Sequence, residues 1–149
     1  MIGFNKQSLD NSAASLASLI KNGTKRQWRE VMETSNRVRS GMDHPHYSVG
    51  IRGLCGGVPV VVTGIRFERL QNISEHDAIL EGVQCVGHEA MIGFGGTDLF
   101  EDYSREEWGC WSAKDSFKSL VVATHGAGLW DRNPWVWVID FKVGNEVLG

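Results

Sequence analysis

The chain has 149 residues, of which 42% are hydrophobic and 22% are charged, and its formal net charge is −3. These values fit a single domain over residues 1–149 and exclude a global electrostatic attraction to nucleic acid. No apolar stretch approaches the roughly 20 residues that a membrane helix needs, and the three widely spaced cysteines indicate free thiols, so we expect a cytoplasmic protein.

The first predicted element is a helix over residues 12–21, which Asn22 and Gly23 end because both residues tolerate left-handed backbone. Residues 24–40 are ambiguous: they form either a second helix or an extended basic segment along a cleft. A short strand is expected near residues 48–52, within a region rich in glycine and proline.

The middle of the chain carries the strongest strand signal, "VVVTGIRFERL" at residues 60–70. Its first residues are β-branched, and apolar and charged residues alternate after them. A short helix is predicted next, because Ser74 can cap its start and Gly82 can end it. We expect residues 87–109 to form a loop, with or without a turn of helix.

The last third is predicted to hold a helix between Ser112 and Gly126, a loop over residues 127–134 and a closing strand at "WVWVIDFKV", residues 135–143. Helices and strands alternate without a regular βαβ rhythm. This order predicts a mixed α+β fold or a small barrel and argues against a doubly wound sheet.

Charge is unevenly distributed along the chain. An acidic stretch runs from Asp98 to Glu107, whereas a basic stripe lies near the start. Such a stripe can bind phosphates even on an acidic protein, and the alternative is a solvated surface. The basic stripe consists of Lys21, Lys25, Arg26, Arg29, Arg37 and Arg39.

Three motifs together resemble the ASCH superfamily, and most closely its phage and prophage members. The first is Arg69-Leu70-Gln71 at the end of the central strand, and the second is the helix end from Ala78 to Gly82. The third is Trp130, followed by Asn133-Pro134 and the strand that alternates tryptophan with valine. The resemblance implies a small PUA-like mixed β-barrel with helices at its rim and a cleft across one mouth.

In that fold the closing strand would be one strand of the barrel wall. Trp135, Trp137 and Ile139 would share one face, and Asp140 would lie on the other face with Val136 and Val138. Asp140 could then reach the cleft or pair with a nearby arginine. The resemblance therefore implies a protein, phage-encoded and acting in the host cytoplasm, that binds RNA or a nucleotide-like ligand at a basic cleft.

One branch of the superfamily resembles an amidohydrolase of acetylated cytidine, and other members are ribonucleases. Lys25 and Glu81 fall on the lysine and glutamate of that amidohydrolase, so a hydrolase using this pair is the alternative function. Trp28 stands where the branch has its threonine nucleophile, and an indole cannot attack a carbonyl. The substitution adds an aromatic ring on which a base could stack, and whether the protein is an enzyme stays open. The expected nucleic-acid-binding residues are Lys21, Arg26, Trp28, Arg29 and Arg66.

A third hypothesis is binding to a host protein through the acidic stretch, which is interleaved with aromatic residues: Phe100, Tyr103, Trp108 and Trp111. We expect no cofactor and no metal. The spacing of Cys85 and His88 would suit zinc ligands, but no second short-spaced pair completes such a site.

Overall fold

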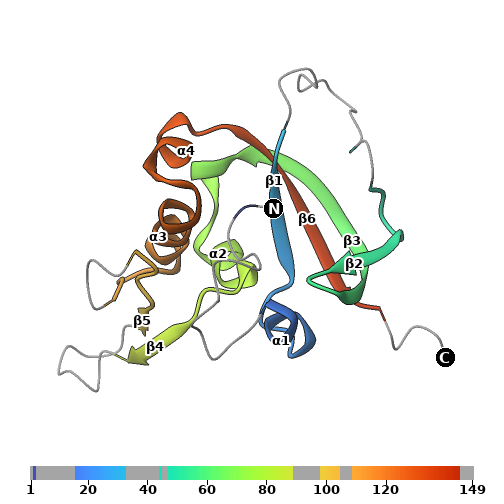
Figure 1. The fold of residues 1–149 in the computed structure, drawn as a ribbon, viewed down its shortest axis with the longest axis horizontal. Coiled ribbons are helices and arrows are strands. Elements are labelled where there is room, and N and C mark those ends of the chain that lie inside the picture. The colour runs from blue at the N-terminus through green and yellow to red at the C-terminus, as the bar shows by residue number, and fades with distance from the viewer. Residues whose placement is uncertain are drawn as a thin grey trace.

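The computed structural model describes residue 2, residues 16–32, residue 44 and residues 47–88, 98–104 and 109–144. A strongly curved sheet and a group of helices on one side of it form the molecule (Figure 1). The predicted α+β class is confirmed, since helices and antiparallel strands both contribute to the structure.

In the described part of the chain the main sheet has four strands in the order β1-β6-β3-β2, and every neighbouring pair is antiparallel. The strands are β1 (Gln27–Val31), β2 (Arg52–Cys55), β3 (Val58–Arg69) and β6 (Trp135–Val143). Among the described residues β1 and β2 do not pair with each other, so the expected barrel is not closed. The sheet is instead an open, curved one with β6 in an inner position.

The two faces of β6 have different surroundings, because successive side chains of a strand point to opposite faces. On one face Trp137 lies edge-on to Phe67 of β3, and Phe141 lies 5.1 Å from the Trp28 ring of β1. On the other face Val138 lies between Arg29 of β1 and Arg66 of β3. This second face, which we call the helix face, carries the charged side chains described below.

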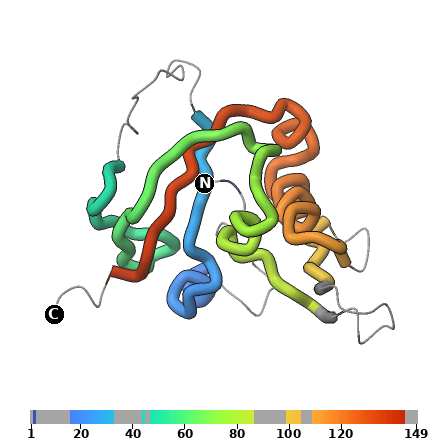
Figure 2. The backbone as a smooth tube through the Cα atoms, turned by 180° about the vertical axis from the view of Figure 1, so that it is seen from behind, coloured from blue at the N-terminus to red at the C-terminus, as the bar shows by residue number. Residues whose placement is uncertain are grey.

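The described residues form four α-helices beside the sheet: α1 (Leu16–Lys21), α2 (Glu75–Glu81), α3 (Ala113–His125) and α4 (Ala127–Arg132). The short 3₁₀ helix η1 (Leu70–Asn72) follows β3. Helices α2, α3 and α4 gather on one side of the sheet in both views, and α1 lies apart from α3 and α4 (Figures 1 and 2). No helix among the described residues is long and apolar enough to span a membrane.

The predicted helix caps are confirmed. The Ser74 hydroxyl accepts from the Asp77 amide at the start of α2, and the Ser112 hydroxyl accepts from the Asp115 amide at the start of α3, each at 3.0 Å. Gly82 follows α2 with a φ of 108°, a left-handed conformation that favours glycine.

The closing strand and the central strand are confirmed, and the ambiguous segment 24–40 is extended over Gln27–Val31, as the second alternative stated. The expected helix 12–21 is found over Leu16–Lys21, while residues 12–15 and 33–40 lie outside the described residues. The strand near residues 48–52 lies slightly later, at Arg52–Cys55.

Two predicted loops were wrong. Residues 127–134 contain helix α4, which buries Leu129 and Trp130 despite the glycine at position 128. The expected loop 87–109 contains β5 (Asp98–Phe100), which pairs with β4 (Cys85–His88) in a second, two-stranded sheet. In both places tertiary contacts outweigh weak local propensity.

Candidate functional site

A buried ion cluster of Lys25, Arg29 and Glu81 lies on the helix face of the sheet. The Lys25 ammonium is 2.8 Å from Glu81 Oε1, and an Arg29 nitrogen is 2.8 Å from Glu81 Oε2. All three residues are 0% exposed. One carboxylate thus holds two cations, and the chain brings together groups 56 and 52 residues apart in sequence.

The turn after α1 places Lys25 in this position. Gly23, with a φ of 81°, reverses the chain, and the Lys25 amide then donates to the Leu19 carbonyl at 2.9 Å. The Lys25 ammonium also donates to the backbone carbonyls of Gln27 at 2.7 Å and Glu81 at 3.1 Å. Three acceptors therefore surround the buried ammonium, as its three N–H donors require.

The cluster continues toward the surface through a second set of charges. The other terminal nitrogen of Arg29 lies 2.8 Å from Glu68 and 3.5 Å from Asp77. Arg66 pairs with both of these carboxylates. Three cations and three carboxylates balance each other in this network, which offsets part of the cost of taking them out of water.

The protonation of Arg29 follows from this arrangement. Burial acts to lower its pKa, but the attraction of Glu81 and Glu68 and their hydrogen bonds outweigh burial, so the pKa is raised above its ordinary value. Arg29 Nε is the single buried side-chain nitrogen or oxygen of the described residues without a hydrogen-bond partner. The guanidinium is therefore charged, and its two terminal nitrogens, but not Nε, bind protein groups.

Gln27 connects the buried ion cluster to Asp140. The Gln27 side-chain oxygen accepts from Arg29 at 2.5 Å, and its amide nitrogen donates to Asp140 Oδ1 at 2.6 Å. Because Arg29 can only donate, the orientation of the Gln27 amide is fixed. Asp140 lies opposite Gly64, where a side-chain carbon would come within 3.1 Å of Asp140 Oδ2.

A pocket of about 790 Å³ adjoins this connection, between the end of α1, helix α2 and the end of β6. The Arg26 backbone joins its walls, since its amide donates to Leu80 of α2 and its carbonyl accepts from Phe141 of β6. Lys25 borders the pocket but is not exposed, so its ammonium lies beneath the floor. Besides Lys25, the polar side chains of the lining are Lys21, Asn22, Arg26, Thr63, His76, Asp140 and Lys142.

The predicted pair of Lys25 and Glu81 is thus brought into direct contact, but in a closed position. Neither group is exposed, and hydrogen bonds to protein atoms occupy both. A hydrolytic role of this pair stays a prediction.

The five predicted nucleic-acid-binding residues divide into two groups. Lys21 and Arg26 are exposed and line the pocket. Trp28, Arg29 and Arg66 do not line it: Arg29 belongs to the buried ion cluster, and Arg66, with a 42% exposed side chain, is paired with carboxylates.

Trp28 occupies a packed position. It is 4% exposed, its ring contacts Phe141 and Tyr47, and its indole nitrogen donates to Glu30 at 3.0 Å. The expectation of a stacking platform needs an accessible ring face. The structure places that ring in the core instead.

Lys142 was missed by sequence reasoning, although it lies two residues after Asp140 on the strand that sequence predicted correctly. The signal that could have found it is the alternation of that strand. Asp140 and Lys142 are two residues apart, so their side chains point to the same face of the sheet unless the strand is irregular.

Two of the three motifs that carry the resemblance, the one at Arg69–Gln71 and the one at Trp130–Pro134, meet in a structural junction between β3 and β6. Asn133 has a left-handed φ of 48° between α4 and β6. Its side-chain oxygen accepts from the Gln71 amide at 2.8 Å, and its carbonyl accepts from Arg69 at 3.1 Å. The Gln71 side chain donates to the Trp130 carbonyl at 2.7 Å. These residues join two distant segments and do not contribute to the pocket.

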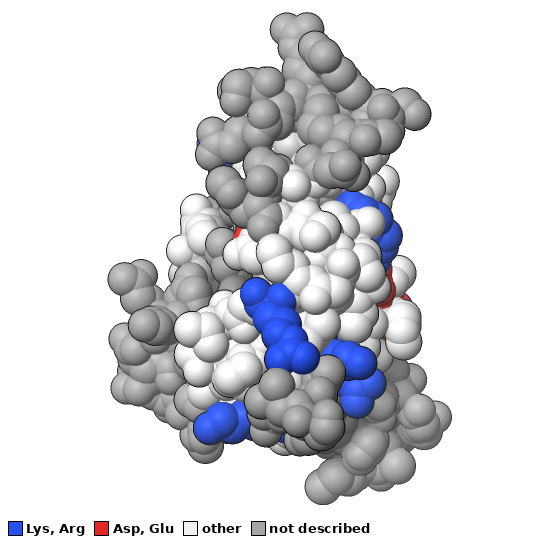
Figure 3. All heavy atoms as spheres, turned by 90° about the vertical axis from the view of Figure 1, so that its right-hand side faces the viewer, with Lys and Arg blue, Asp and Glu red and all other residues white. Residues whose placement is uncertain are grey.

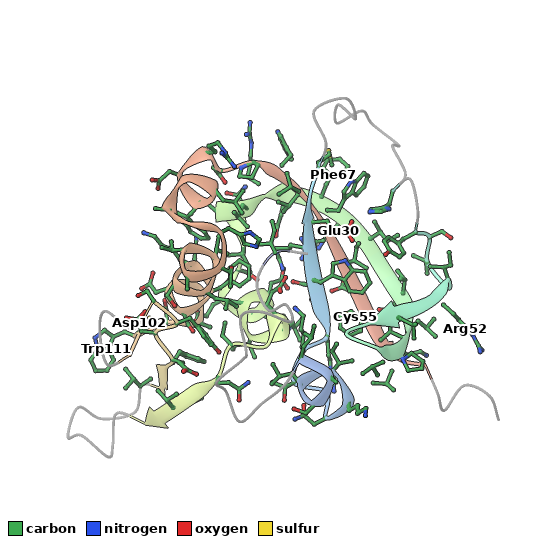
Figure 4. All side chains as sticks on the ribbon, viewed as in Figure 1. Glu30, Arg52, Cys55, Phe67, Asp102 and Trp111 are labelled. Carbon is green, nitrogen blue, oxygen red and sulfur yellow. The ribbon has the colours of Figure 1, made fainter. Side chains whose placement is uncertain are left out.

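The acidic aromatic stretch lies on the helical side of the molecule, where Figure 4 labels Asp102 and Trp111. Trp111 is 49% exposed and lines a shallow pocket of about 400 Å³ together with Asp102, Asp115 and Lys118. Residues 105–108 lie outside the described residues. Binding of a host protein to this stretch stays a prediction.

The cysteines are dispersed over the structure. Cys55 is buried in the core, and burial raises the pKa of its thiol. The backbones of Cys85 and Cys110 form β-bridges with that of Phe100, one on each side of it. Within the described part of the chain, no three histidine, cysteine or acidic side chains are arranged to hold a metal ion.

Comparison with known proteins gives a structural similarity. No protein-family model and no curated protein matches the chain. A crystal structure of an ASCH domain from Lactobacillus crispatus is similar over 95% of this chain and 76% of that chain, with 19% sequence identity and a TM-score of 0.46. The phage or prophage origin that the sequence resemblance implies has no support in this comparison and stays a prediction.

Proposed function

We propose that this protein binds RNA or a nucleotide-like ligand in the pocket that Lys21, Arg26 and Lys142 line. The observation that carries the proposal is the convergence of these three exposed cations on one concave site. They come from the end of α1, from the loop before β1 and from the end of β6. Phosphate groups are the ligand that such a set of lysine and arginine side chains attracts.

The distribution of charge supports this location. Lys25, Arg29 and Arg66 are each paired with carboxylates, whereas among the described residues no ion pair is formed by Lys21, Arg26 or Lys142. Because the net charge is −3, an anionic ligand must be attracted locally. Figure 3 shows the right-hand side of the molecule as drawn in Figure 1, where basic side chains are visible at several places and acidic ones at few.

The buried ion cluster gives the pocket a firm floor. Lys25 ties the loop before β1 to Glu81 of α2, and the Arg26 backbone ties the same loop to α2 and β6. A site whose walls are already held in place loses less conformational entropy when a ligand binds. In this proposal Lys25 and Glu81 position the cationic residues and do not contact the ligand.

The proposal is tested by measuring how the affinity for a labelled oligouridylate depends on salt concentration. In the double variant Lys21→Ala/Lys142→Ala, binding should weaken at low salt. The slope of log affinity against log salt should become shallower by about 0.7 for each phosphate that the variant no longer neutralises, the value typical of single strands.

Arg132→Ala is the matched control, because Arg132 is an exposed cation that precedes β6 at the strand end opposite the pocket. Its salt slope should equal that of the wild type. Equal slopes for the double variant and the wild type would contradict the proposal, as would wild-type protein that binds no oligouridylate at low salt.

A further inference from the structure

The pocket contains one acidic side chain among otherwise neutral and basic ones. Asp140 is half-buried on β6, and among the described residues of the lining it is the sole carboxylate. A carboxylate repels phosphate, so its presence beside Lys21, Arg26 and Lys142 works against binding of a simple anion. Its position calls for a ligand group that the carboxylate can bind.

Asp140 is held in one orientation by its neighbours. Its Oδ1 accepts from Gln27, whose own amide is fixed by Arg29. Gln27 is 1% exposed, so this support is out of reach of water. Asp140 Oδ2 has no hydrogen-bond partner among the described residues, and Gly64 leaves the space beside it unfilled. The carboxylate thus keeps one acceptor oxygen for a ligand.

The chemistry of that acceptor narrows the choice of donor. An ionised carboxylate accepts hydrogen bonds and cannot donate them. A cationic donor would be repelled by the three basic side chains of the lining, so the donor is neutral. In a nucleotide, the neutral donors are ribose hydroxyls and the N–H groups of the bases.

The rings near the pocket favour the sugar over the base. Phe141 and Trp28 are each 4% exposed, so neither offers a face that would hold a base beside Asp140. His76 is the exposed ring of the described lining, and stacking on it would tolerate any base. The ribose lies next to the phosphate, which places its hydroxyl within the region of the cationic side chains.

We propose that Asp140 accepts a hydrogen bond from a ribose 2′-hydroxyl and makes the pocket selective for ribonucleotides over deoxyribonucleotides, with no dependence on the base. This inference rests on the proposed function. The 2′-hydroxyl is the group by which proteins distinguish RNA from DNA, and a hydrogen bond to a charged acceptor is among the stronger ones.

The test compares oligouridylate, oligodeoxyuridylate and 2′-O-methyl oligouridylate of equal length and label. Wild-type protein should bind the ribose form about tenfold more tightly than the other two, the effect of one charge-assisted hydrogen bond. Uracil has no exocyclic amine, so this preference cannot come from a base amine. The methylated strand keeps the 2′ oxygen but lacks the donor, and it requires no protein variant.

The matched protein variant is Asp140→Asn, which keeps the shape of the side chain. Gln27 should hold the new carbonyl oxygen, which leaves an amide N–H where Oδ2 was. The preference for the ribose form over the 2′-O-methyl form should fall to about onefold, because an N–H in that place cannot accept from the hydroxyl and can donate to either 2′ oxygen. Affinity for the deoxyribose form should stay equal or rise, since a negative charge is removed.

Different results separate this inference from the function on which it rests. Equal wild-type binding of all three strands, with a salt slope that depends on Lys21 and Lys142, would overturn the role of Asp140 and leave the phosphate site intact. Oligocytidylate serves as a fourth strand: if Asp140→Asn loses affinity for it while affinity for oligouridylate is unchanged, the carboxylate binds a base amine and the inference is overturned. Absence of binding to every strand would overturn both.

Discussion

Glu81 is the residue on which the buried ion cluster depends. Its two carboxylate oxygens contact Lys25 and Arg29, and all three side chains are inaccessible to water. Removal of one member of such a group leaves the others charged and uncompensated in a poorly polarisable environment. The position is therefore far more sensitive than that of an ordinary surface carboxylate.

We predict that Glu81→Ala lowers the free energy of unfolding by about 3–5 kcal/mol, the cost of uncompensated buried charge. Urea unfolding followed by circular dichroism measures the change. Asp131→Asn, at an exposed acid of α4, is the control and should stay within about 0.5 kcal/mol of the wild type. A loss below about 1 kcal/mol in Glu81→Ala would show that the charges find other partners or water.

Tyr103 is a second residue whose ionisation is coupled to folding. Its hydroxyl oxygen accepts from the Gln84 amide at 3.1 Å, and burial raises its pKa well above the ordinary value of 10.0. The neutral phenol therefore contributes stability that is fully present below pH 10. As the pH rises further, the unfolded chain loses this proton while the folded one keeps it, which favours unfolding.

Tyr103→Phe separates the contribution of the Gln84 hydrogen bond from the contribution of the phenol's ionisation. At a pH of about 8 the variant should be less stable by about 1–3 kcal/mol, because the Gln84 amide loses its acceptor. The gap between variant and wild type should narrow as the pH rises above about 10, since only the wild type has this proton to lose. Denaturant titrations over that range test the sign, and a gap that widens would contradict the assignment.

At the scale of elements, the junction between β3 and β6 is held largely by hydrogen bonds to Asn133 and its neighbours. Asn133 supplies both a left-handed backbone and a side-chain acceptor for the Gln71 amide. Glycine can replace the first property but not the second, whereas alanine can replace neither.

We predict that Asn133→Gly costs about 1 kcal/mol of stability through the missing acceptor, and that Asn133→Ala costs about 1–2 kcal/mol more because of its strained φ. Thermal and urea unfolding of both variants give the two values. If alanine is tolerated as well as glycine, the left-handed conformation is not what constrains this position.

Sequence reasoning succeeded for elements whose boundaries are set by local chemistry. The Ser74 and Ser112 caps and the glycine at the end of α2 follow from hydrogen bonds and backbone freedom within a few residues. It failed for α4 and β5, which depend on burial against distant segments. Helix α4 buries Leu129 and Trp130, and Phe100 of β5 is 8% exposed.

The same division applies to the site. The contact between Lys25 and Glu81 could be expected from the family resemblance. The burial of both side chains could not, because their exposure depends on how β1, α2 and β6 pack. Trp28 is the clearest case. Its identity suggests a ring for stacking, whereas its register opposite Ile139 turns it toward the aromatic face of the sheet.

At the scale of the whole molecule, the sheet order places the strand that comes last in sequence between two strands from the first half of the chain. β6 pairs with β1 and β3, which do not pair with each other over the residues that the structure describes. Val136, Val138 and Ile139 are 0% exposed, and each such burial contributes about 1.5–3 kcal/mol. The pocket depends on the same strand, which supplies Asp140 and Lys142.

This sheet order has a consequence for biosynthesis. While the ribosome is adding the residues before Trp135, β1 and β3 both lack β6, the strand with which each forms a ladder in the described part of the chain. A nascent chain in that condition exposes apolar surface and unpaired strand edges, which promote aggregation and are bound by chaperones. β1 and β3 can be joined in one sheet only after β6 has left the exit tunnel, so the fold and the pocket that depends on β6 both require the synthesis of Trp135–Val143.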